Sequence, residues 1–116
     1  MLSVVAALPG EELIQKGLAD LERGVESVEA LLVSIGAPRL ERLGFRITSP
    51  IESPEDRLYE LLAAEDSDSA HSRYNALVRR LVSFESAAEH AKSVTELEAE
   101  LRELRASGAS PIDQSR

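Results

Sequence analysis

The chain has 116 residues, a common size for a single domain with one hydrophobic core. Apolar residues make up 43% and charged residues 29%, near the averages for globular proteins, so the composition excludes an intrinsically disordered chain. The formal net charge is −8, and this excess of acidic groups disfavours binding to nucleic acid or to an anionic membrane surface.

The absence of cysteine excludes disulfides, thiolate metal ligands and a thiol nucleophile, and it fits a reducing compartment. Residues 1–8 are apolar, but they lack a basic leader and are followed by Pro9 and Gly10, so we expect neither a signal peptide nor a membrane span. We therefore expect a cytoplasmic protein. A single helical domain is predicted over residues 1–105, with a disordered tail over residues 106–116, where Ser, Gly and Pro are frequent.

The clearest pattern is a heptad repeat in the first third of the chain. Its apolar residues follow one another at alternating gaps of four and three: Ile14, Leu18, Leu21, Val25, Val28, Leu32 and Ile35. This spacing predicts one helix over residues 11–35 that packs against a partner helix at roughly 20° and ends before Pro38. The last residues of this helix are apolar on several sides, so we expect them in the middle of the core.

Two glycines, Gly17 and Gly24, lie beside this stripe one heptad apart. Each costs about 1 kcal/mol of helix propensity relative to alanine. One hypothesis is that a second helix crosses closely there, because glycine lets two backbones approach. The alternative is that both are tolerated surface glycines.

Shorter elements are expected in the middle of the chain. Residues 39–43 are predicted to form one helical turn ended by a glycine, and residues 45–50 an extended segment. Ser53 is predicted to cap a helix whose first residue is Pro54. The polar residues 65–69 should end that helix.

Two apolar stripes occupy the last part of the chain. The first predicts a helix that begins near Ser69 and contacts at least two others; it consists of Tyr74, Leu77, Leu81, Phe84, Ala88 and Ala91. The second stripe, Val94, Leu97, Leu101 and Leu104, is out of phase with the first. Ser93 and Glu96 form a capping-box pattern between them, so we expect a new helix to begin there. The alternative is one long helix with a local irregularity of the repeat.

Four amphipathic helices with short connections predict an all-α fold, a small four-helix up-and-down bundle. The stripes on the first and last helices are candidate surfaces for self-association. We therefore expect a homodimer, in which a second copy completes the bundle, or another protein partner.

No group of residues matches a known metal-binding pattern. A di-iron bundle needs Glu-x-x-His pairs, which place two ligands one turn apart on the same face of a helix. The nearest fragment is Asp68 with His71, and Ala87 takes the corresponding place before His90. We therefore predict no metal and no cofactor.

Two acidic pairs, Glu85 with Glu89 and Glu96 with Glu100, share helix faces as magnesium-binding carboxylates do. Such pairs are frequent in a chain with 21 acidic residues, so solubility is the simpler interpretation. The sequence also contains no Gly-x-Ser-x-Gly turn and no glycine-rich phosphate loop. We predict no catalytic residue.

One basic stretch runs against the overall charge, because residues 69–84 contain no acidic side chain. At the start of a helix, free N–H groups and the helix dipole favour an anion. The candidate ligand-binding residues are His71, Arg73, Tyr74, Asn75 and Arg80. The structural alternative places Tyr74 in the core and pairs the arginines of this stretch with acidic faces elsewhere, such as Glu22, Glu26 and Glu29.

These patterns lead to two main functional hypotheses. The first is a protein–protein interaction or scaffold module that has no chemistry of its own and binds through apolar helix stripes. The second is a small domain or enzyme subunit that binds an anionic ligand with residues 71–80. A third, an acidic mimic of DNA, requires carboxylates spaced like phosphates, an arrangement that a sequence does not reveal.

Overall fold

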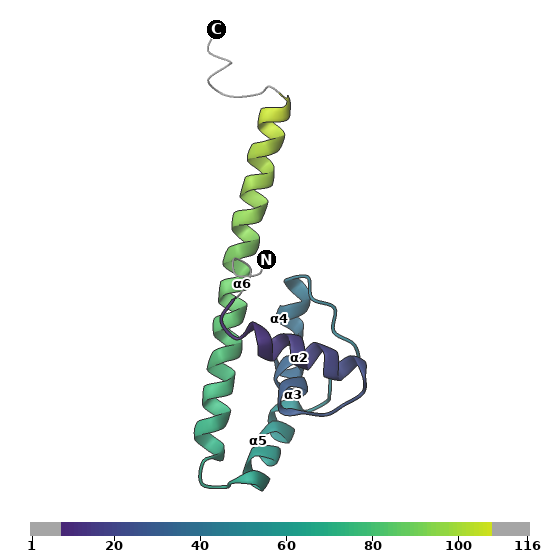
Figure 1. The fold of residues 1–116 in the computed structure, drawn as a ribbon, viewed down its shortest axis with the longest axis vertical. Coiled ribbons are helices and arrows are strands. Elements are labelled where there is room, and N and C mark those ends of the chain that lie inside the picture. The colour runs from purple at the N-terminus through teal and green to yellow at the C-terminus, as the bar shows by residue number, and fades with distance from the viewer. Residues whose placement is uncertain (1–7, 108–116) are drawn as a thin grey trace.

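The computed structural model describes residues 8–107, and within this range the protein is helical without strands (Figure 1). The helices are α2 (Glu11–Glu22), α3 (Val28–Ile35), α4 (Ala37–Arg42), α5 (Pro54–Glu65) and α6 (Ala70–Ser107). The all-α prediction is therefore confirmed. The four-helix up-and-down arrangement is not confirmed, because the described residues form five helices and α6 is far longer than the others.

The first heptad stripe does not form one helix, and the prediction of a single helix over residues 11–35 is wrong. The chain leaves the helical conformation after α2 and turns at Gly24, whose φ of 72° is easily reached by glycine. It re-enters a helix after Ser27, whose hydroxyl accepts a hydrogen bond from the Ala30 amide at 3.0 Å. The turn places α2 across α3 (Figure 1), so the two halves of the stripe cover each other.

Gly17 and Gly24 prove to have different roles. A Cβ atom at Gly17 would lie 2.4 Å from the Glu29 carbonyl oxygen and 2.5 Å from Val33 Cγ2. The hypothesis of a close helix crossing is therefore confirmed for Gly17, and the crossing helix is α3. The hypothesis is wrong for Gly24, where a Cβ would meet no atom within 4 Å and the left-handed backbone is what favours glycine.

The centre of the core is α3, which contacts α2, α4, α5 and α6. Leu31, Leu32 and Val33 are fully buried, which confirms the prediction that this stretch lies in the middle of the core. The helix ends at Ile35 with Gly36 as its C-cap, as predicted. A new helix, α4, follows at once and replaces the single turn expected over residues 39–43.

Helices α5 and α6 form a hairpin, and both of them contact α3 (Figure 1). Helix α5 begins at Pro54 with Ser53 at its N-cap position, as predicted, but Ser53 has a φ of 49° and its side chain makes no capping hydrogen bond. In the link between the two helices, Asp66 Oδ1 accepts a hydrogen bond from the Asp68 amide at 3.1 Å. Because α6 contacts both α5 and α3, the prediction of at least two neighbours for this helix is confirmed.

Helix α6 continues through Ser93 without interruption, and the predicted break there is wrong. The reason lies in local propensity: α6 contains no Gly or Pro, and good helix formers such as Ala91, Lys92 and Glu96 surround the serine. A capping-box pattern alone does not end the preceding helix; a helix-breaking residue is also needed. At the far end Ala106 and Ser107 are still helical, and the remainder of the expected tail lies outside the described residues.

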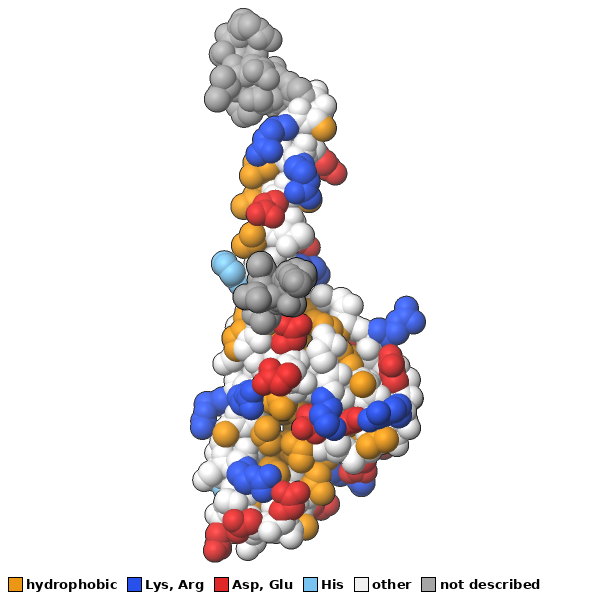
Figure 2. Space-filling view, in the orientation of Figure 1, with side chains coloured by type: hydrophobic (Ala, Val, Ile, Leu, Met, Phe, Trp, Pro, Cys, Tyr) orange, Lys and Arg blue, Asp and Glu red, His pale blue; other side chains and the backbone are white. Residues whose placement is uncertain are grey.

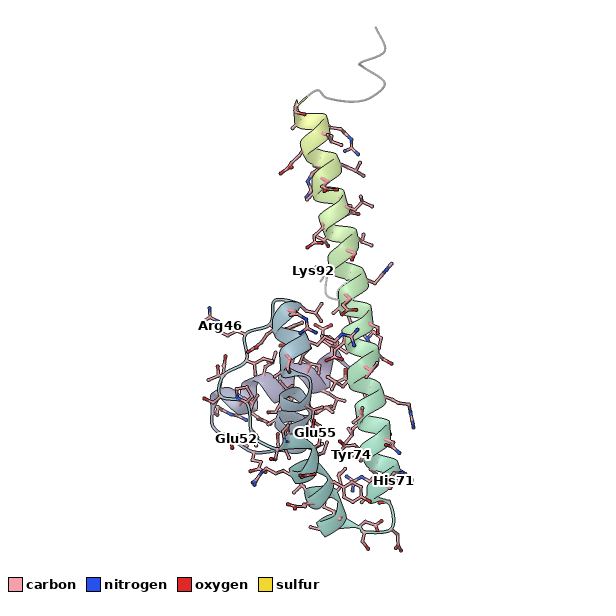
Figure 3. The ribbon with its side chains drawn as sticks, turned by 180° about the vertical axis from the view of Figure 1, so that it is seen from behind. Arg46, Glu52, Glu55, His71, Tyr74 and Lys92 are labelled. Carbon is pink, nitrogen blue, oxygen red and sulfur yellow. The ribbon has the colours of Figure 1, made fainter. Side chains whose placement is uncertain are left out.

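The molecule is elongated because α6 extends beyond the other helices (Figure 1). Its extents are 71 × 28 × 26 Å and its radius of gyration is 19.3 Å, against about 13 Å for a compact domain of 100 residues. We call residues 8–92 the body and residues 93–107 the arm. At their junction the Lys92 ammonium donates to the Arg42 carbonyl oxygen at 3.2 Å (Figure 3). None of the described helices is both long and apolar enough to cross a membrane.

Candidate functional site: the apolar stripe of the arm

The arm carries an apolar stripe that no other described part of the chain covers. The exposed fractions of its four residues are 40% for Val94, 56% for Leu97, 44% for Leu101 and 46% for Leu104. We call these four residues the arm stripe. On the same helix within the body, Leu81 and Phe84 are only 3% and 1% exposed, so one helix carries a covered stripe and an uncovered one.

The two stripes of α6 lie on different sides of the helix. Val94 comes one residue earlier than the body stripe would place its next member, and one residue is about 100° around an α-helix. Figure 2 shows hydrophobic side chains along the left edge of the arm, whereas the body widens to the right. The arm stripe is therefore open to another chain without displacement of the body.

Charged residues flank the arm stripe at the positions that face a partner helix in a coiled coil. In a heptad with Val94 and Leu101 at position a, Glu98 and Arg105 occupy position e and Glu100 occupies position g. All three side chains are exposed. Side chains at e and g form ion pairs between helices, so these three residues can determine which partner binds and in which direction.

The candidate ligand-binding residues of α6 do not converge on one point. Asn75 Nδ2 lies 3.2 Å from His71 Nε2 at the start of the helix. Arg73 forms a 2.9 Å ion pair with a glutamate of α5, Glu65. Arg80 lies two turns further along and forms a 2.9 Å pair with a glutamate of α2, Glu12. Arg73 and Arg80 therefore pair with acidic residues of other helices, as the structural alternative expected, although the partners are not the glutamates it named.

Tyr74 lies on the side of α6 that faces α5 (Figure 3). Its ring packs against Tyr59 with a centroid distance of 5.8 Å and is half-buried. Burial raises the pKa of the Tyr74 hydroxyl, and the negative charges of Glu55 and Asp56 raise it further. The hydroxyl thus stays protonated at neutral pH, and the ring serves the α5–α6 contact.

The acidic pair Glu85 and Glu89 holds an arginine. Arg39 of α4 donates to both oxygens of Glu89 at 2.8 Å and to Glu85 Oε1 at 3.2 Å. Burial raises the pKa of the nearly inaccessible Glu85, whereas the hydrogen bonds from Arg39 lower the pKa of Glu89. Within residues 8–107 no group of three or more His, Cys, Asp or Glu side chains is placed to hold a metal ion.

A buried aspartate that the sequence analysis missed joins α2 to α3. Asp20 is 1% exposed and accepts hydrogen bonds from Lys16 Nζ at 2.8 Å, from Ser27 Oγ at 2.7 Å and from Arg23. The hydrogen bonds from Lys16 and Ser27 lower the pKa of Asp20 to about 2. Lys16, four residues before Asp20, and Arg23, three residues after it, are the signals of this arrangement in the sequence. The cluster stabilises the turn between the two helices.

An open hollow of about 410 Å³ lies where the start of α2 meets α6. It is lined by Pro9, Gly10, Ala76, Arg79, Arg80 and Ser83. The acidic partner of Arg80 is Glu12, and Arg79 forms no ion pair among the described residues. Among the residues of the basic stretch, Arg79 and Arg80 therefore line a hollow in which a small anion could bind.

Comparison of the chain with protein-family models, with curated proteins and with solved structures found no match. The most distinctive feature of the described residues is the exposed apolar stripe of the arm. A helix that leaves the body with a regular apolar stripe and flanking charges has the features of one strand of a coiled coil.

Proposed function

We propose that the protein is an interaction module in which the body supports the arm and the arm binds a helix of another chain, with no chemistry of its own. The exposure of Val94, Leu97, Leu101 and Leu104 along one side of a projecting helix carries the proposal. A cytoplasmic location, which the lack of cysteine supports, is part of it.

The energetics of the arm support this function. A helix in a protein owes most of its stability to packing of its apolar face, and the arm has no such packing within the described residues. Contiguous exposed apolar surface on a folded protein marks interaction sites more often than it is neutral. A partner helix with its own apolar stripe would bury the arm stripe and hold the arm in its helical form.

Photocrosslinking in living cells tests the proposal without knowledge of the partner. A photoreactive amino acid replaces Glu98, which flanks the arm stripe at position e and leaves its four apolar residues intact. We expect irradiation to convert this variant into a discrete species of higher mass, which mass spectrometry then identifies.

The matched control places the same amino acid at Glu103, an exposed glutamate of the arm at position c, away from the stripe. It should give little of that species. Absence of a crosslinked species at Glu98, or equal yields at both positions, would contradict an interaction through the arm stripe.

The hollow beside Arg79 and Arg80 favours a second candidate function, the binding of a small anionic ligand. Thermal unfolding with inorganic phosphate tests it, because a ligand that binds the folded state raises Tm. We expect a concentration-dependent rise that is lost in Arg79→Gln and kept in Arg102→Gln, a control on the arm. Equal shifts in both variants, or no shift at all, would exclude this ligand class.

A further inference from the structure

We propose that the occupant of the arm stripe is the same stripe of a second copy of this chain, and that the two arms run parallel and in register. This inference depends on the proposed function and adds the identity and direction of the partner. It is carried by the heptad positions of the exposed residues and by the charges beside them.

The arm stripe matches the pattern of a two-stranded coiled coil. Val94 and Leu101 occupy position a, and Leu97 and Leu104 occupy position d. Leucine at both d positions together with a β-branched residue at an a position favours two strands over three or four. Such a stripe is self-complementary, since the same residues form both sides of the contact.

The flanking charges favour the parallel direction. In a parallel dimer, position g of one helix faces position e of the next heptad on its partner, so Glu100 meets Arg105 of the second copy. Symmetry creates this attractive pair twice. The remaining position e residue of the arm, Glu98, faces the uncharged Ser93.

The antiparallel direction places like charges together. The alignment that buries all four apolar residues sets Val94 against Leu104 and Leu97 against Leu101. Near the middle of this contact, Glu98 of one copy then faces Glu98 of the other, and Glu100 of one copy faces Glu100 of the other. Like charges at these positions destabilise a coiled coil, so the sequence of the arm selects against this direction.

The extent of the contact is set by the residues before the arm. Continued backwards, the stripe reaches the exposed His90 at position d, the small Ala87 at position a, and then Ser83 and Arg80, so its large apolar side chains end at the base of the arm. The two arms would therefore pair over about two heptads, and both bodies would lie at the same end of this coiled coil. An interface of this size is at the weak end of the range, with a dissociation constant on the order of 10 µM.

Disulfide trapping in the full chain tests both the partner and the direction, because the natural sequence contains no cysteine. Two variants, Val94→Cys and Leu104→Cys, are oxidised in a glutathione buffer separately and as a mixture. In a parallel dimer each position faces itself, so each variant alone should form a covalent dimer, and the mixture should give no disulfide between positions 94 and 104.

The antiparallel arrangement gives the opposite result. There the two thiols at position 104 are separated by about 15 Å along the helix axis, beyond the reach of a disulfide, and position 94 faces position 104. Crosslinks found mainly between the two variants would therefore overturn the parallel direction. A Glu103→Cys variant, away from the stripe, reports the background rate of random collision.

Charge reversal gives an independent readout by sedimentation equilibrium. Glu100→Arg should weaken dimerisation about tenfold because Arg would face Arg105, and the double variant Glu100→Arg with Arg105→Glu should restore it. Glu103→Arg makes the same change in net charge without weakening the dimer. Equal affinities for Glu100→Arg and Glu103→Arg would contradict the proposed pairing.

The outcomes also separate this inference from the proposed function. If no stripe variant forms a covalent dimer above the background while photocrosslinking at Glu98 captures a different protein, the second copy is excluded and the interaction module remains. If photocrosslinking also fails, both proposals are wrong.

Discussion

The body and the arm contain the same kind of apolar repeat and use it in different ways. In the body, the heptad stripe of the first third of the chain is divided between α2 and α3, which pack against each other and bury Ile14, Leu21 and Leu32. In the arm, an equally regular stripe stays exposed. A heptad repeat therefore specifies a helical partner without specifying whether that partner belongs to the same chain.

The physical difference between the two regions is the presence of a turn. Gly24 lets the chain leave one helix, and Ser27 starts the next, so the first stripe can fold onto itself. No glycine or proline interrupts α6, and the arm therefore remains straight and extends away from the body.

Truncation of a stripe residue should have different consequences in the two regions. Leu32→Ala removes a fully buried side chain of α3 and should lower the free energy of unfolding by about 2–5 kcal/mol at any protein concentration. Leu101→Ala on the arm should change it by less than about 0.5 kcal/mol in dilute solution. Urea denaturation of the full chain measures both. A comparable loss for Leu101→Ala at high dilution would show that the arm stripe is covered within one chain.

The close contact between α2 and α3 at Gly17 can be tested by adding a single methyl group. Gly17→Ala would drive a Cβ into the Glu29 carbonyl oxygen and should cost about 2 kcal/mol, because α2 and α3 must move apart. Gly24→Ala is the matched control, with open space around it and a cost of about 1 kcal/mol from its left-handed backbone. Thermal unfolding should rank the two variants in this order, and the reverse order would contradict the crossing.

Acid should weaken the body through Asp20. Its folded-state pKa of about 2 lies below the ordinary value of 3.8, so its charged form contributes stability that is fully present above about pH 4. That contribution is lost as the pH falls through about 2. Tm measured between pH 5 and pH 2 should therefore fall less steeply for Asp20→Asn than for the natural protein. Parallel curves would show that the Asp20 cluster does not couple folding to protonation.

Much of the candidate site followed from the sequence, although its context did not. The spacing of Val94, Leu97, Leu101 and Leu104 predicted an apolar stripe suited to association, and these residues are exposed on a helix. The prediction that a helix begins at Ser93 was wrong, and the arm was therefore not expected to project. The capping-box pattern of Ser93 and Glu96 describes how a helix can begin, but it does not show whether the preceding helix ends there.

The basic stretch of α6 shows a different limit of sequence analysis. The absence of acidic residues near Arg73 and Arg80 suggested unpaired positive charge, yet their acidic partners lie on other helices, at Glu65 and Glu12. Ion pairs between residues far apart in the sequence depend on the packing of the helices. Pairing with acidic residues of other helices was therefore foreseen as an alternative, but the particular partners were not.

The all-helical fold, the start of α5 and the apolar side of each helix could be read from the amino-acid sequence, because propensity and periodicity act over a few residues. Two further features depend on how the helices pack: the first stripe folds back on itself with a close contact at Gly17, and α6 extends beyond the other helices. Those outcomes depend on which surfaces meet in space. The hydrophobic effect is non-directional, so it does not specify which apolar surfaces pack together. The sequence therefore shows which helix sides are apolar, but it does not show which helix packs against each of them.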